Sequence, residues 1–232
     1  MSSKVYAGAA EALHDMTDGV SIMSGGFGLC GIAENCIDEI ERRGVKDLTI
    51  ISNNCGNMGM GLAVLLKSHQ VKKVICSYVG GNPDLEEQML NCTVEVELNP
   101  QGTFAERIRA GGCGIPAFYT PTGVGTVIAQ GKDVRAFNGV DCLLETALTA
   151  DFAIVKAQRG DTAGNLVFKE SARNFSPLMA AAGRITVAEV EELVAAGEID
   201  PDHVHVPGIF VNRIFQGRDY RNTIEKMTLR EE

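Results

Sequence analysis

Strand-like and helix-like segments alternate regularly along the first half of this 232-residue chain. Short apolar runs at 19–23, 47–53 and 71–79 are each followed by a stretch in which apolar residues recur at helical spacing. The connections between these segments are short, as in sheets whose parallel strands are joined by covering helices. The alternation therefore predicts an α/β fold: an open, mostly parallel sheet flanked by helices.

The helix expected at 33–44 shows how the pattern works. Cys36, Ile37 and Ile40 fall on one face of this helix, opposite its charged residues. Gly44 stands just beyond the last turn, where glycine commonly ends a helix. Such a segment is expected to lay its apolar side on one face of the sheet.

The character of the sequence changes near residue 120. Turn pairs at 130–132 and 137–140 lie between short extended segments, a pattern typical of β-hairpins. The pattern of residues 160–175 indicates a second segment outside the main sheet that contains a hairpin. We therefore expect the fold to contain a β-hairpin-rich insertion.

Further strands are expected at 151–157 and 184–193, and residues 201–215 are expected to be extended or loop. No shift in composition marks a linker, and no internal repeat is visible. The sequence is therefore interpreted as a single domain over residues 1–217, followed by a polar C-terminal tail at 218–232.

The charge of the chain argues against nucleic acid as a partner. The formal net charge is −9, whereas a nucleic-acid-binding surface is basic. An anionic ligand would have to be held by backbone N–H groups, by a few cations or by a partner chain. No segment has the apolar length of a membrane span or of a signal peptide, so no membrane contact is expected and the expected location is cytoplasmic.

The cysteines are expected to be reduced structural thiols. There are seven, an odd number, at wide spacings and without a C-x-x-C pair. Most stand in apolar segments, where a free cysteine packs as a small hydrophobic side chain. The four histidines do not combine with them into a metal-ligand pattern, so no metal is expected.

A G-x-G-x-x-G sequence follows the first expected strand, with glycines at Gly26, Gly28 and Gly31. A glycine loop between a strand and a helix can present backbone N–H groups to a dinucleotide. A dinucleotide site also needs a carboxylate at the end of the next strand, where this chain has Asn53 and Asn54. No G-K-[ST] follows the loop, which excludes a P-loop, and an NAD-binding oxidoreductase remains an alternative.

The stretch around this loop, DGVSIMSGGFGLCGIA, resembles the A-subunit signature of the family I coenzyme A transferases. Ala33 stands where that family usually has proline, which alters the rigidity of the helix start but not the ligand chemistry. Other segments are similar to A subunits of the succinyl-CoA:3-ketoacid transferases in this family: residues 44–57, 99–126 and 160–178. The resemblance covers about residues 4–217.

The resemblance implies transfer of CoA between two carboxylic acids, from succinyl-CoA to a 3-oxo acid such as acetoacetate. In this family a glutamate carboxylate attacks the acyl-CoA, and a mixed anhydride then leads to a glutamyl-CoA thioester. That glutamate lies in a Ser-Glu-Asn-Gly motif of the partner B subunit, and this chain has no such motif. The chain alone is therefore expected to be inactive and to need a B subunit, in the α2β2 assembly usual for the family.

No cofactor is implied, because coenzyme A is itself a substrate. Acetate–acetoacetate and 3-oxoadipate CoA transferases are near relatives and stay open as alternatives. Other classes also remain: a non-catalytic CoA- or acyl-binding protein that acts alone, and the sugar-phosphate isomerases that are related by fold.

The resemblance also implies roles for particular residues. Gln101 matches the side-chain oxyanion donor of the family, the catalytic role expected of this chain. Asn53 and Asn54 follow a strand and are expected to hydrogen-bond the acid substrate, or else to cap the next helix. The glycine loop is expected to shape the pocket against the partner's glutamate with Gly25, Gly26, Phe27, Gly28 and Gly31. The alternative for Phe27 is a place in the core.

Three glutamates would be candidate nucleophiles if the chain were active alone. Glu34 follows the glycine loop, but an acid there is expected in the first turn of a helix, where its charge favours the helix dipole. Glu106 is expected to be a solvated or paired surface acid, and Glu145 is a similar candidate. Arg173 and Asn174 also match the family, and we expect them to serve structure or a subunit contact.

Overall fold

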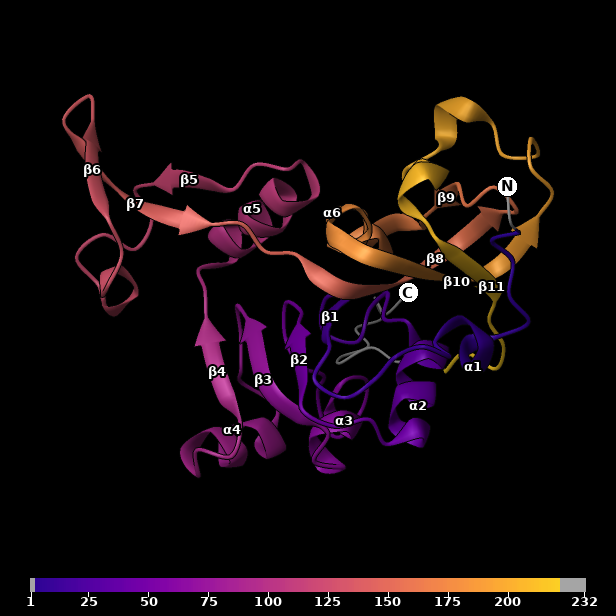
Figure 1. Ribbon diagram of the computed structural model, residues 1–232, viewed down its shortest axis with the longest axis horizontal. Helices are drawn as coiled ribbons and strands as arrows, with labels where there is room; N and C mark the ends of the chain where they lie inside the picture. The colour runs from indigo at the N-terminus through magenta and orange to yellow at the C-terminus, as the bar shows by residue number, and fades with distance from the viewer. Residues whose placement is uncertain (1–2, 222–232) are drawn as a thin grey trace, which may run out of the picture.

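Parallel strands form the main sheet of the computed structural model, which describes residues 3–221 of the chain. In chain order they are β1 Ser21–Ser24, β2 Leu48–Ile51, β3 Val71–Cys76, β4 Glu95–Leu98, β8 Ala150–Asp161, β10 Gly183–Val194 and β11 Arg213–Gln216. Across the sheet the order is β11-β10-β8-β1-β2-β3-β4, so the chain builds outward from β1 in both directions (Figure 1). The expected open, mostly parallel sheet is confirmed.

Helices cover both faces of this sheet. They are α1 Ala9–Ala12, α2 Glu34–Arg43, α3 Ala63–Lys67, α4 Pro83–Leu90, α5 Gln101–Gly112 and α6 Ser176–Ala182. Helices α1 to α4 lie on one face, and α5 and α6 lie on the other (Figure 1). Among the described residues, no helix combines the length and the apolar character needed to cross a bilayer.

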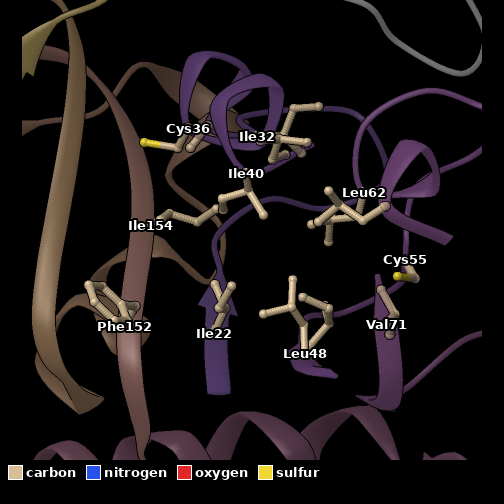
Figure 2. Close-up of a cluster of buried hydrophobic side chains, with 14 of the residues drawn as sticks. Ile22, Ile32, Cys36, Ile40, Leu48, Cys55, Leu62, Val71, Phe152 and Ile154 are labelled. Carbon is tan, nitrogen blue, oxygen red and sulfur yellow. The ribbon is translucent and has the colours of Figure 1, made fainter. Parts of the chain in front are cut away.

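The strands send alternate side chains to the two faces of the sheet, where they pack in separate hydrophobic clusters. On β1, Ile22 packs in the cluster shared with α2, whereas Met23 packs with Phe104 of α5 and Met179 of α6. Figure 2 shows the first cluster, in which Ile22 and its neighbours on the strands face Ile40 of α2. Because both faces of the sheet are buried, its central strands are almost continuously apolar.

Helix α2 forms as its sequence pattern predicts. Cys36, Ile37 and Ile40 are at most 1% exposed and pack in the core. Gly44 adopts a φ of 67°, and its N–H donates to the carbonyl oxygens of Ile40 and Glu41. Glycine suits this position because a left-handed φ strains a residue that carries a Cβ atom.

A buried carboxylate holds the N-terminus of α2. Glu189 of β10 is fully buried, and its carboxylate accepts hydrogen bonds from the N–H groups of Asn35 at 3.3 Å and Cys36 at 2.9 Å. Burial raises the pKa of Glu189 to about 7, although the two N–H donors favour its charged form. These contacts tie α2 to a strand two places away from β1 in the sheet.

The hairpin-rich insertion is a separate antiparallel sheet at one end of the molecule (Figure 1). Its strands are β5 Ala117–Thr120, β6 Val134–Phe137 and β7 Val140–Thr146, in the order β5-β7-β6. Asn138 and Gly139 turn between β6 and β7 with φ of 50° and 77°, as a tight two-residue hairpin requires. This turn confirms the prediction at 137–140. The segment before 130–132 instead forms a 3-10 helix, Val127–Ala129, and not a strand.

The second half of the chain contains the expected second hairpin, a helix that was not predicted and an extended segment near its end. Strand β9, Leu166–Val167, pairs antiparallel with β8 and forms the hairpin expected within 160–175. Helix α6 was not predicted from the sequence. The segment expected to be extended or loop at 201–215 ends in β11, which joins the edge of the sheet beside β10.

All seven cysteines are free thiols in the described part of the chain. Four of them are buried: Cys36, Cys55, Cys76 and Cys142. Burial raises the pKa of the Cys76 thiol to about 11, which keeps it protonated and unreactive at neutral pH. The expected role as structural thiols is confirmed for these four, whereas Cys30 is half-buried and Cys92 and Cys113 are exposed.

Helix α5 contains a position where a methyl group does not fit. A Cβ atom on Gly111 would lie 1.9 Å from the backbone oxygen of Leu148, whereas a Cβ atom on Gly102 of the same helix meets nothing within 4 Å. In an open helix position, alanine is more stable than glycine by about 1 kcal/mol. We expect Gly111→Ala to lower the free energy of unfolding by about 1–3 kcal/mol, because the backbone must shift.

Denaturant titration followed by circular dichroism measures this free energy. Gly102→Ala is the matched control, and it should leave the free energy of unfolding unchanged or slightly higher. Equal stability of the two variants would contradict the close approach of α5 to Leu148.

Candidate functional site

A tight glycine turn leaves the end of β1 at the centre of the sheet. Phe27 and Cys30 exchange two backbone hydrogen bonds of 3.0 Å, which close the turn. Gly28 and Gly31 have φ of 59° and 75°, a conformation that residues with a Cβ atom rarely adopt. Phe27 lies at the turn and is 50% exposed, so the alternative that it is a core aromatic is wrong.

Successive N–H groups of this turn are hydrogen-bonded within the chain. Gly25 N–H donates to the carbonyl oxygen of Ile154 at 3.0 Å, and Gly26 N–H donates to Asn174 Oδ1 at 3.0 Å. Gly28 N–H donates to Asn54 Oδ1 at 2.8 Å. A phosphate-binding loop needs such groups free for its ligand. The geometry therefore disfavours a dinucleotide site here.

Asn174 and its neighbours pack against the back of the turn. The side chain of Asn174 also donates to the carbonyl oxygen of Cys30 at 3.1 Å, so it has the structural role expected of it. A Cβ atom on Gly25 would lie 2.4 Å from Ser176 Oγ, and one on Gly31 would lie 2.6 Å from a backbone oxygen in the same segment. These two glycines allow the turn and this segment to pack closely.

A cavity of about 520 Å³ opens beside the turn, at the carboxyl ends of β1, β2 and β3. It is lined by Phe27, Gly28, Asn53, Asn54, Asn57, Ser77, Tyr78, Gly80 and Gln101. Open parallel sheets bind ligands at this edge, outside the carboxyl ends of their strands. The cavity brings together five of the residues predicted from the sequence, while Gly25, Gly26 and Gly31 do not line it.

The polar side chains of the cavity contact one another. Asn53 Oδ1 lies 2.9 Å from Gln101 Nε2 and 2.9 Å from Ser77 Oγ. Asn53 Nδ2 donates to Asn54 Oδ1 at 3.3 Å. The alternative that the two asparagines cap the next helix is wrong, because α3 begins at Ala63 and has no side-chain cap.

The cavity lining is neutral. Among its residues, all within the described range, there is no Asp, Glu, His, Lys or Arg. Its amide and hydroxyl groups can hydrogen-bond a carbonyl or carboxylate oxygen, but they do not supply a carboxylate nucleophile. A reaction in this cavity that uses a carboxylate nucleophile needs one from outside its lining.

The three candidate glutamates lie outside the cavity lining. Glu34 begins α2, as expected, and accepts a hydrogen bond from an arginine side chain. Glu106 forms an ion pair with Arg109 at 2.6 Å, and this contact lowers the pKa of Glu106, as expected for a paired acid. Glu145 is buried and pairs with Lys132 at 2.6 Å. Each is engaged in a contact within the chain.

Four lining residues were not predicted from the sequence: Asn57, Ser77, Tyr78 and Gly80. Ser77 follows β3 directly, much as the asparagine pair follows β2. A search for polar residues after every parallel strand would have found it. The other three reach the cavity through the paths of their loops, which leave no pattern in the sequence.

The chain matches the family model described as coenzyme A transferase over residues 6–217. It is 56% identical over 228 residues to the A subunit of succinyl-CoA:3-ketoacid coenzyme A transferase from Helicobacter pylori (strain J99 / ATCC 700824), with 98% of each chain covered. It is 47% identical, over an alignment of 250 positions, to the human mitochondrial succinyl-CoA:3-ketoacid coenzyme A transferase 2. That alignment covers 100% of this chain and 48% of the human protein.

Among solved structures, the fold is similar to that of an acyl-CoA transferase from Escherichia coli O157:H7 in a thioester complex with CoA. The TM-score is 0.84 at 21% sequence identity, and the match covers 95% of this chain and 48% of that chain. This chain thus spans about half the length of that protein, and the likeness at this identity concerns the fold. The family match extends over the main sheet, the antiparallel insertion and the cavity, and the chain belongs to the coenzyme A transferase family.

Proposed function

We propose that this chain is the A subunit of a CoA transferase that moves CoA from succinyl-CoA to a 3-oxo acid, with acetoacetate as the acceptor. A B subunit supplies the nucleophilic glutamate, and the two chains form an α2β2 assembly. One observation carries the proposal: the cavity gathers hydrogen-bonding groups but has no carboxylate of its own. The names of relatives that match this chain over nearly their full length support the choice of substrates.

The proposed reaction starts with the glutamate of the partner. Its carboxylate oxygen attacks the thioester carbon of succinyl-CoA, the C–S bond breaks, and the CoA thiolate leaves a mixed anhydride behind. The thiolate then attacks the glutamyl carbonyl carbon and releases succinate. The acceptor acid takes CoA from the resulting glutamyl-CoA thioester by the same steps in reverse, so the reaction needs no further cofactor.

The proposed contribution of this chain is to stabilise charge on the reacting oxygen. Each attack on a carbonyl carbon places negative charge on its oxygen, and a fixed N–H donor lowers the energy of that state. Gln101 is the proposed donor, because its amide nitrogen is held at the cavity by Asn53. Phe27 and Gly28 form the wall beside it, and the exposed ring of Phe27 provides apolar contact for an acyl chain.

The proposal predicts that neither subunit alone holds a complete active site. The purified chain alone should show no CoA transfer between succinyl-CoA and acetoacetate, and a mixture with a B subunit that carries Ser-Glu-Asn-Gly should show transfer. A spectrophotometric assay of acetoacetyl-CoA formation measures both. Transfer by this chain alone would contradict the proposal and would make Glu34 the candidate nucleophile.

The proposal also predicts that loss of the Gln101 amide slows the chemical step. In the two-subunit enzyme, Gln101→Ala should lower kcat by about 10²–10³-fold, as is found when one oxyanion donor is removed. The matched control is Gln130→Ala, because Gln130 is exposed and does not line the cavity. Equal kcat values for the two variants would remove Gln101 from the proposed mechanism.

A further inference from the structure

We propose that a relay of side-chain amides, from the glycine turn through Asn54 and Asn53, holds the amide of Gln101 as a hydrogen-bond donor to the cavity. In this relay the two asparagines are positioning residues, in place of the direct contact with the acid substrate expected from the sequence. The inference rests on the proposed function, since it explains how Gln101 is kept in the orientation that an oxyanion donor needs.

Two backbone groups fix the orientation of Asn54. The oxygen and nitrogen of a carboxamide have nearly the same shape, so the partners of the group decide which end points where. Gly28 N–H can only donate, and it lies 2.8 Å from Asn54 Oδ1. The carbonyl oxygen of Gly56 can only accept, and it lies 3.4 Å from Asn54 Nδ2. The backbone therefore sets Asn54 with its oxygen toward the turn.

The orientation of Asn53 follows from that of Asn54. Because Asn54 Oδ1 accepts hydrogen bonds, Asn53 turns its nitrogen toward it, at 3.3 Å. Asn53 Oδ1 then faces the other way, toward Ser77. The hydroxyl of Ser77 lies between two acceptors, Asn53 Oδ1 at 2.9 Å and the backbone oxygen of Asn53 at 3.1 Å, so it donates to Asn53. Asn53 is only 3% exposed, so a reversed amide would leave buried groups unpaired.

Gln101 is the last member of the relay. Asn53 Oδ1 is an acceptor, so Gln101 must direct its nitrogen toward it, at 2.9 Å. That nitrogen carries two protons; one bonds to Asn53, and the other stays available for a ligand in the cavity. Gln101 is exposed at the start of α5, so without Asn53 its amide is free to rotate. With the amide reversed, its oxygen would face the developing oxyanion and repel it.

A double-mutant cycle on the two-subunit enzyme tests the relay. Asn53→Ala should lower kcat by about 10-fold with the native Gln101, but by less than about 2-fold in the Gln101→Ala background. The two losses differ because Asn53 has nothing to position once Gln101 is absent. KM should change little in either case. Equal fold losses in the two backgrounds would show that Asn53 acts independently of Gln101, and would overturn the relay.

Two further variants distinguish an effect of the relay from a general loss of structure. Ser77→Ala removes one donor to Asn53 Oδ1 and leaves the other contacts in place, so it should lower kcat in the same direction by a smaller factor. Asn91→Ala changes an exposed asparagine at the end of α4 and should leave kcat unchanged. A loss in Asn91→Ala as large as in Asn53→Ala would count against the relay.

The orientation of Gln101 can be tested on this chain alone, without activity. In a sample with 15N-labelled glutamine side chains, the resonances of Gln101 are those lost in Gln101→Ala. The amide proton that bonds to Asn53 should resonate downfield, and Asn53→Ala should move this resonance upfield because the proton loses its acceptor. Unchanged resonances in Asn53→Ala would overturn the relay. An unmodified two-subunit mixture without transfer activity would instead refute the proposed function, while the spectra still decide the orientation.

Discussion

The site depends on the parallel pairing of β1 with β2. Ile22 lies opposite Ile50, and Met23 lies opposite Ile51, so the two strands end at the same edge of the sheet. The glycine turn that follows β1 and the asparagine pair that follows β2 are therefore within reach of one another, and Gly28 N–H bonds to Asn54. A shift of one residue in this register would turn core side chains to the other face and separate the two loops.

Because the two loops are adjacent, backbone N–H groups of the glycine turn are hydrogen-bonded within the chain. Its N–H groups bond to β8, to Asn174 and to Asn54, so the turn is a wall of the cavity and not a cradle for phosphate. The neutral amides that line the cavity suit a reaction in which negative charge develops during the chemical step. The nucleophile of such a reaction would come from another chain. Because the cavity has no carboxylate, we propose that this chain provides hydrogen-bond donors and that a second subunit provides the nucleophile.

The features that could be predicted from the sequence are those that depend only on neighbouring residues. The periodic apolar residues of α2, the glycine after it and the Asn138-Gly139 turn each require only neighbouring residues, and each appears where expected. The role of Gln101 as an oxyanion donor is instead a prediction from the resemblance to a family. The contacts of Ser77 and the orientation of the asparagines were not predictable, because they depend on which strands lie side by side. The constraint on Gly25 likewise comes from Ser176, far along the chain.

The central claim is that the glutamate that carries CoA lies outside this chain. The most direct measurement is the intact mass of both chains once the reconstituted enzyme has been mixed with succinyl-CoA and quenched before an acceptor acid is added. We expect the B subunit to gain the mass of bound CoA and this chain to keep its own mass. A CoA adduct on this chain, mapped to Glu34 or another of its glutamates, would contradict the claim.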